Sequence, residues 1–360
     1  MAAFIEAIGL ISGLLGIVQF GLDNFSSDDS EGSTIRISVG LDFDGGLSNS
    51  GGDLPDVRLF NEVGGFLGIK ADPGSVDKGK FSDITVKHKD GAGSQATYTL
   101  FSANDDAICV AAATISWPNG DKYAWVGDWG RQCGGTWYYS NTYVGATNYK
   151  PDCLWIDANG DQPQTGFQVH WPEFANKGDS AIPDTPEDQT ARIEDICNSG
   201  PPFKLRVQPD TDPRDITYWT PHTPRSDGLV ERDVTGVSYG PSKHAASAKF
   251  RRYHYPRSAN GTTTVHDMVR ESLVMSDSKI HTATDLCGSE TSYGPDFINL
   301  STGMFCSMSD KTLWPICGNG DGADTTQKDC FDVASQQLIV GGLKARDEPY
   351  KKVIDWTSSQ

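Results

Sequence analysis

Short runs of alternating apolar and polar residues fill the chain between Thr34 and Trp171, and they restrict the folds open to it. The clearest runs are TIRISVGLDF, DITVKHK, ATYTLFS, AICVAAATISW and YAWVGDW. A period of two is typical of half-buried β-strands, and turn sequences such as PNGD and DANGD separate the runs. Strands do not alternate with helices, which argues against a doubly wound sheet. The sequence therefore predicts a mainly β fold, with an antiparallel β-sandwich over residues 33–172.

The chain changes character after residue 172. Nine of the 19 prolines fall between Pro172 and Pro224, where long apolar runs are few. We expect a Pro-rich strap over residues 173–227, followed by a smaller C-terminal domain of mixed structure over 228–360. The 39 glycines and the 38 aspartates against 10 glutamates fit short strands joined by many turns.

The first 25 residues form an apolar, glycine-studded segment that is expected to be an amphipathic helix. Its apolar face includes Leu10, Leu14 and Val18, and its small-residue edge carries Gly9, Gly13 and Gly16. Glycine in a helix interior costs about 0.5–1 kcal/mol relative to alanine, so a close neighbour is expected to compensate. That neighbour is a groove of the same domain, a second copy of the chain or a bilayer interface.

A conventional signal peptide is not expected at this end. No lysine or arginine precedes Arg36, whereas a secretory leader needs a basic start. The segment is also short and glycine-rich for a membrane span.

Eight cysteines occur without a CxxC pair, which argues against zinc-ribbon and thioredoxin-type sites. They are Cys109, Cys133, Cys153, Cys197, Cys287, Cys306, Cys317 and Cys330. The even number and the close group of the last four indicate disulfides, and those four alone allow three connectivities. Free thiols in a reducing compartment are the alternative. Cysteine usage favours an extracellular or cell-surface location.

Three residues are candidates for catalysis. Ser238 stands in a GxSxG match, the motif of a nucleophile elbow, which requires a strand followed by a turn and a helix. His170 and Glu173 belong to the sequence HWPE, where a histidine beside a carboxylate suits acid–base work or glycoside hydrolysis. A chance match and solvated carboxylates at strand ends are the alternatives, and we do not expect an enzyme.

The loop DANGD places oxygen-bearing side chains at Asp157, Asn159 and Asp161, as in the first half of a Ca²⁺ loop. An EF-hand needs glycine at position 6 and glutamate at position 12, where this chain has Gln162 and Gln168. We expect a β-turn, with Ca²⁺ binding as the alternative and no other cofactor.

Aromatic residues are densest between positions 125 and 143. The candidates for a binding patch are Trp125, Trp129, Trp137, Tyr138 and Tyr139. Exposed rings would stack on sugars or anchor a protein interface, whereas buried rings would form a core with hairpin turns.

Three passages resemble a group of ascomycete fungal proteins that have no assigned activity. They are ISWPNGDKYAWVGDWGRQCGGTWYYSN, PDCLWIDANGDQPQTGFQVHWPEF and DLCGSETSYGPDFINLSTGMFCSMSDKTLWPIC. The resemblance covers about a third of the chain and implies a fungal origin. It also implies that Cys287, Cys306, Cys317 and Cys330 form a disulfide-bonded C-terminal unit.

These features predict a non-enzymatic structural or interaction protein that self-associates through its N-terminal helix, with a filament or lattice as the extended form. A membrane-active, toxin-like protein that uses the same helix as a wedge is one alternative. A secreted carbohydrate-binding protein or hydrolase is the other. Nucleic acid is not an expected partner, because a net charge of −18 repels phosphate backbones.

Overall fold

A computed structural model of the chain describes residues 31–40, 51–77, 79–89, 91–143, 149–175, 183, 185–221, 232–239, 271–318, 329–344 and 350–357. These residues form several antiparallel sheets and few helices, which confirms the prediction of a mainly β fold. The predicted N-terminal helix over residues 1–25 lies outside the described residues.

The chain divides into two compact units. Unit 1 takes Met1–Phe43, Asn49–Thr136 and Ser140–Tyr255. Unit 2 takes Asp44–Ser48, Trp137–Tyr139 and Pro256–Gln360. Each unit is described below by itself.

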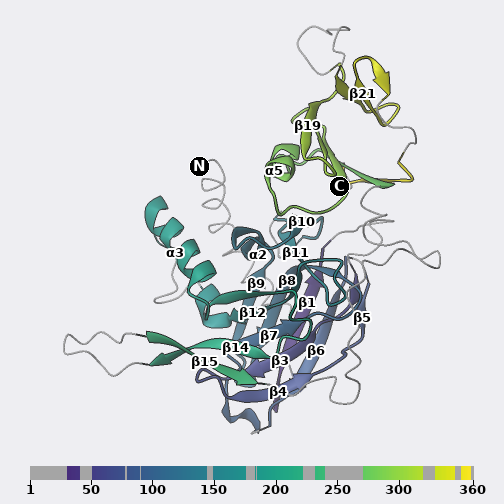
Figure 1. The fold of residues 1–360 in the computed structure, drawn as a ribbon. Helices are drawn as coiled ribbons and strands as arrows, with labels where there is room; N and C mark the ends of the chain where they lie inside the picture. The colour runs from purple at the N-terminus through teal and green to yellow at the C-terminus, as the bar shows by residue number, and fades with distance from the viewer. Residues whose placement is uncertain are drawn as a thin grey trace. The chain divides into compact units, whose positions relative to one another are not determined.

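The first sheet of unit 1 is built around its longest strand, β8, in which every residue is buried (Figure 1). β8 pairs antiparallel with β1, β9 and β11, and β1 pairs antiparallel with β6 on its other side. The strands are β1 (Gly32–Val39), β6 (Phe81–Lys87), β8 (Ile108–Ser116), β9 (Lys122–Val126) and β11 (Asp152–Ile156). The alternation read in the sequence is visible in β1, where Ile35 and Ile37 are fully buried and Arg36 pairs with Asp83 at the surface.

The second sheet of unit 1 has five strands in the order β13-β12-β7-β3-β4, all antiparallel. The strands are β3 (Asp56–Phe60), β4 (Phe66–Lys70), β7 (Tyr98–Ser102), β12 (Gln164–His170) and β13 (Phe203–Val207). Unit 1 also contains a short antiparallel pair, β2 (Gly52–Asp53) with β5 (Ser75–Val76), and a 3-10 turn, η1 (Gly91–Gly93).

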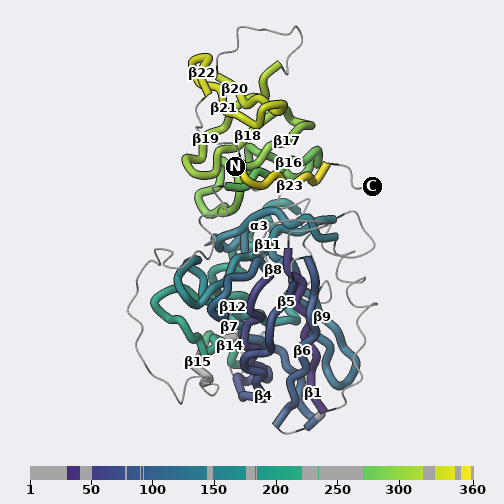
Figure 2. Tube along the Cα trace, turned by 90° about the vertical axis from the view of Figure 1, so that its right-hand side faces the viewer, coloured from purple at the N-terminus to yellow at the C-terminus, as the bar shows by residue number. Residues whose placement is uncertain are grey.

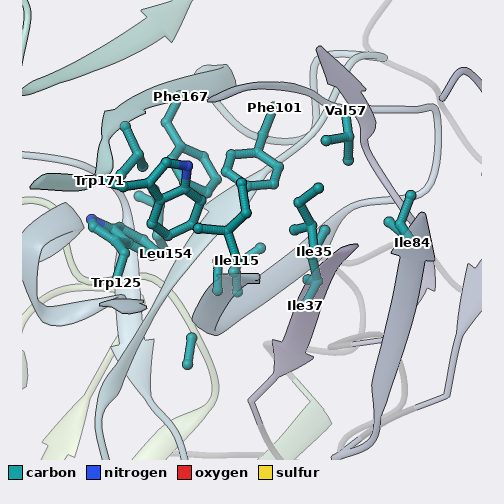
Figure 3. Packing of buried hydrophobic residues seen from close by; sticks show 14 of the residues in the cluster. Ile35, Ile37, Val57, Ile84, Phe101, Ile115, Trp125, Leu154, Phe167 and Trp171 are labelled. Atoms are coloured by element: carbon teal, nitrogen blue, oxygen red, sulfur yellow. The ribbon is translucent and has the colours of Figure 1, made fainter. Parts of the chain in front are cut away.

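One hydrophobic cluster joins the inward faces of both sheets (Figure 3). Ile35 and Ile37 come from the first sheet, and Phe101 and Phe167 come from the second. The rings of Phe101 and Phe167 stack with centroids 4.7 Å apart. Burial of these side chains stabilises the fold by about 25 cal/mol for each Å² of apolar surface removed from water.

The segment predicted as a strap contains regular structure. It includes the helix α3 (Pro186–Asn198), the edge strand β13 and the strand β14 (Asp215–Pro221), which forms a hairpin with β15 (Arg232–Tyr239) beyond the segment. α3 begins where Thr185 caps the N–H of Asp188 and Pro186 occupies the first turn. Its residues Ile193 and Ile196 join the main core. Helix-start signals therefore outweigh the local density of proline.

Unit 2 contains a five-stranded sheet in the order β19-β18-β17-β16-β23 (Figure 2). β16 pairs in parallel with both β17 and β23, and the other pairs are antiparallel. The elements are β16 (Ser272–Ser276), α5 (Ala283–Gly288), β17 (Asp296–Asn299), β18 (Met304–Ser307), β19 (Thr312–Pro315) and β23 (Lys352–Asp355). A small antiparallel sheet lies between β19 and β23 in the chain, with β20 (Cys330–Asp332), β21 (Gln337–Val340) and β22 (Leu343–Lys344).

Three consecutive aromatic residues, β10 (Trp137–Tyr139), belong to unit 2 although the residues on both sides of them belong to unit 1. The Trp137 indole N–H donates to Ser289 Oγ at 2.9 Å, and the Tyr138 hydroxyl donates to the Pro295 carbonyl at 3.0 Å. A Cβ at Gly294 would lie 2.2 Å from the Tyr138 ring, so only glycine fits there.

All eight cysteines form disulfides: Cys109–Cys153, Cys133–Cys197, Cys287–Cys306 and Cys317–Cys330. The predicted disulfide-bonded group near the C-terminus is confirmed, with both of its bridges inside unit 2. Four disulfides indicate an oxidising environment, as outside the cell.

Candidate functional site

His170 and Glu173, two of the three candidate catalytic residues, lie in contact in unit 1. β12 ends at His170 and is followed by the 3-10 turn η2 (Trp171–Phe174), which has Pro172 near its start. Proline cannot continue the ladder of the sheet, so the chain turns and returns Glu173 to the histidine. Two further residues, Glu62 from the β3–β4 turn and Arg192 from α3, complete what we call the His170 cluster.

The imidazole of His170 is buried between two carboxylates. Its Nε2 lies 2.9 Å from Glu62 Oε2, and its Nδ1 lies 3.5 Å from Glu173 Oε1. The first contact is a hydrogen bond, whereas the second is an ion contact that is too long for a good hydrogen bond. The Tyr98 ring stacks on the imidazole with centroids 4.2 Å apart. Arg192 Nη2 donates to Glu173 Oε2 at 2.7 Å.

The charged groups of the cluster shift one another's pKa values toward the ionised forms. Burial by itself would lower the pKa of His170, but contacts with Glu173 and Glu62 outweigh it and raise that pKa above its ordinary value. Burial would raise the pKa of Glu173, yet His170 and Arg192 hold it at about 2. Glu173 is therefore an ionised carboxylate at any physiological pH.

This geometry does not favour glycoside hydrolysis. The general acid of such a reaction needs a raised pKa, because it must hold a proton near neutral pH. The pKa of Glu173 is shifted in the opposite direction, and Arg192 occupies one of its oxygens. The cluster instead ties η2 and α3 to the β3–β4 turn through charge-assisted hydrogen bonds.

We expect the contribution of the cluster to stability to depend on pH. A raised histidine pKa stabilises the fold fully below the ordinary value of about 6.5, and this is lost as the pH rises through the folded value. Glu62→Gln should therefore lower the urea midpoint most near pH 6, and the difference from the wild type should shrink toward pH 9. Urea titrations at several pH values measure this. Glu194→Gln, at an exposed position of α3, is the control. If the urea midpoint falls by the same amount at every pH, the assignment of a positive charge to His170 is contradicted.

Ser238, the third candidate catalytic residue, lies inside the strand β15. It pairs with Ile216 of β14 in an antiparallel hairpin. A nucleophile elbow instead exposes its serine on a turn between a strand and a helix. Residues 240–270, which come directly after β15, lie outside the described part of the chain.

The five aromatic candidates are buried and belong to two different cores. Trp125 and Trp129 join the core of unit 1, where Trp125 stacks on Phe167 with centroids 4.7 Å apart. Trp137, Tyr138 and Tyr139 are at most 1% exposed and lie in unit 2. Each ring packs within its own unit, so the five rings do not form one exposed binding patch.

Two side-chain oxygens of the DANGD loop accept hydrogen bonds from the loop's own backbone, while the buried Asp157 Oδ1 has no hydrogen-bond partner among the described residues. Asp157 Oδ2 accepts the N–H groups of Gly160 and Asp161, each at 2.7 Å. Asn159 Oδ1 accepts the N–H of Asp161 at 3.2 Å. Burial raises the pKa of Asp157 to about 6. Within the described ranges, no three His, Cys, Asp or Glu side chains gather as ligands of a metal ion would.

The residues Gly9, Leu10, Gly13, Leu14, Gly16 and Val18 of the candidate assembly or membrane helix lie outside the described residues. Among the helices that the structure does describe, none is both long and apolar enough to cross a bilayer.

Sequence reasoning missed two members of the His170 cluster, Glu62 and Arg192, and the Tyr98 ring that stacks on the imidazole. The sequence around Glu62 indicates only a turn, and Arg192 lies in the segment interpreted as a strap. Comparison with known proteins adds no assignment: no protein-family model matches the chain, and no curated protein matches it.

Proposed function

We propose that this chain is a non-enzymatic fungal structural or interaction protein that acts outside the cell and self-associates through its N-terminal helix. In this proposal the two sheets of unit 1 form a β-sandwich body, and copies join through residues 1–25 into a filament or lattice. The observation that carries it is a glycine-ridged apolar segment placed ahead of a disulfide-bonded β body.

The disulfides support the location. Both units are cross-linked internally, with two bridges in each. Such bonds persist in oxidising surroundings and suit proteins that must survive outside the cell. A cell-surface position is the finer form of this proposal.

The candidate sites support a role without catalysis. The His170 cluster holds Glu173 as an ion-paired carboxylate, and Ser238 lies in a paired strand. The rings considered for glycan stacking are buried. Association is the role that the glycine edge of residues 9–16 suits best, because small residues let a second helix approach closely.

Substitutions in the apolar face test the proposal. Light scattering on the full-length wild type is expected to show a mass above that of one chain, at all but the lowest protein concentrations. Leu14→Lys with Val18→Lys should reduce it to one chain, because two charges cannot be buried in a helix–helix contact. Gln19→Lys, on the polar flank of the same segment, is the matched control and should leave the mass unchanged.

Dye release from liposomes separates assembly from the membrane alternative. A wild type that is a single chain in solution but releases dye, with release lost in the double lysine variant, would overturn assembly in favour of a membrane wedge. A single chain without dye release would overturn both interpretations of the segment.

A further inference from the structure

Two buried carboxyl groups lie together in unit 1, where the helix α2 (Asp128–Gln132) meets the strand β11. Asp128 is the first residue of α2, and Asp152 is the first residue of β11. The Tyr149 hydroxyl donates to Asp128 Oδ1 at 2.7 Å, and the Asp152 backbone N–H donates to the same oxygen at 3.3 Å. The second oxygen of Asp128, Oδ2, is buried and has no hydrogen-bond partner among the described residues.

Among the described residues, no cation forms an ion pair with Asp128. Arg131, on α2 itself, places Nη1 3.0 Å from Asp152 Oδ2. Among the described residues, the groups that face Asp128 are Asp152 from β11 and the Tyr149 phenol, which is neutral when it donates to Oδ1. The contact of Arg131 is with Asp152, so an ionised Asp128 would be buried without an ion-pair partner in the described part of the chain.

We infer that Asp128 holds its proton in the folded chain, and that a rise in pH loosens the packing of α2 on β11 by forcing a second negative charge into the pair. Burial and repulsion from Asp152 raise the pKa of Asp128 well above its ordinary value. Burial likewise raises the pKa of Tyr149, which keeps the phenol protonated as a donor. Because the closed state holds the Asp128 proton more tightly than an open state would, its stabilisation is complete below about pH 4. It is lost as the pH rises through the raised value.

The opening would be local, because disulfides bound the region. α2 is followed by Cys133, which is bonded to Cys197, and Asp152 is followed by Cys153, which is bonded to Cys109. A rise in pH would then separate α2 from β11 within these cross-links and leave the rest of unit 1 folded. The contact between α2 and β11 is then a pH-sensitive element suited to acidic surroundings. It does not depend on the proposed self-association.

Hydrogen exchange tests the opening on the full-length chain. The amides of Arg131 and Cys133 donate to the carbonyls of Gly127 and Trp129, so their protection reports on α2. After correction for the intrinsic pH dependence of exchange, we expect their protection to fall about tenfold for each pH unit between pH 4 and the Asp128 pKa. Asp128→Asn, which mimics the neutral acid, should remove this slope. Asp77→Asn, at an exposed position, should keep it. A flat wild type, or an equal slope in Asp128→Asn, would overturn the inference.

A carbon-13 NMR titration of aspartate carboxyl groups in the wild type gives a readout that does not depend on a variant folding. Besides Asp157, whose pKa is raised to about 6, one aspartate is expected to titrate well above the ordinary value of about 3.9, and its signal should be absent from Asp128→Asn if that variant folds. A wild type in which no aspartate other than Asp157 titrates well above that ordinary value would overturn the inference.

Discussion

Arg58→Ala is expected to lower the free energy of unfolding of unit 1 by about 3–5 kcal/mol, because it leaves a buried ion-pair network without its cation. Arg58 is fully buried in β3. Its Nη1 donates to Ser102 Oγ at 2.8 Å, and its Nη2 donates to Asp212 Oδ1 at 3.2 Å. Nη2 also lies 3.7 Å from Asp56 Oδ2. The substitution would remove the Arg58 guanidinium from beside Asp56, which is fully buried, and urea titration at neutral pH measures the loss.

The chain offers a matched control for this prediction. Arg36 also forms an ion pair across a sheet, with its Nε 2.7 Å from Asp83 Oδ1, but Asp83 is well exposed. Exposed pairs contribute about 0–1 kcal/mol, so Arg36→Ala should have a small effect. Equal losses for the two variants would show that burial does not decide the strength of these pairs, and would contradict the prediction.

Removing the Cys133–Cys197 disulfide by a double substitution to alanine is expected to cost about 4 kcal/mol. The bond closes the longest loop of the four bridges, with a sequence separation of 64 residues. In the chain-entropy account, a cross-link stabilises by restricting the unfolded chain, and the effect grows with the length of the loop. The bridge also joins the end of α2 to α3, so α3 should be the first element to lose protection. Urea unfolding under non-reducing conditions, followed by hydrogen exchange, measures both effects.

The Cys317–Cys330 bridge provides the comparison, since it closes a separation of only 13 residues. Its removal should cost unit 2 about 3 kcal/mol on the same account. If removing the Cys133–Cys197 bond lowers the free energy of unfolding by less than about 1 kcal/mol, the entropic argument is contradicted. Native contacts around α2 and α3, rather than the cross-link, would then account for the stability of this region.

Strands with a clear period of two were the most predictable part of this fold. The runs read at TIRISV, DITVK and AICVAAATIS coincide with β1, β6 and β8. β6 and the second half of β1 bury one face in the core, so local sequence and tertiary packing agree there, whereas every residue of β8 is buried. β13 was not predictable in the same way, because its local sequence lies between proline-rich stretches. It forms a strand because it pairs with β12, which comes earlier in the chain.

The candidate site was predictable only where its residues are neighbours in sequence. His170 and Glu173 are three residues apart, and Pro172 between them brings the two together. Glu62 is 108 residues away from His170, so its contact depends on how β3 and β12 are placed in the sheet. The disulfide connectivity near the C-terminus has the same origin: Cys287 meets Cys306 because α5 packs on β18, which spacing along the chain does not encode.

The aromatic triplet Trp137–Tyr139 makes unit 2 discontinuous in sequence. A fragment that starts at Pro256 would lack three buried side chains of unit 2, together with their hydrogen bonds to Ser289, Pro295 and the Thr282 carbonyl. A fragment that ends at Tyr255 would in turn carry three aromatic side chains stripped of their packing partners. The two units therefore cannot be separated by a single cut of the chain, and unit 2 is not a module that could have been added intact to one end of an existing protein.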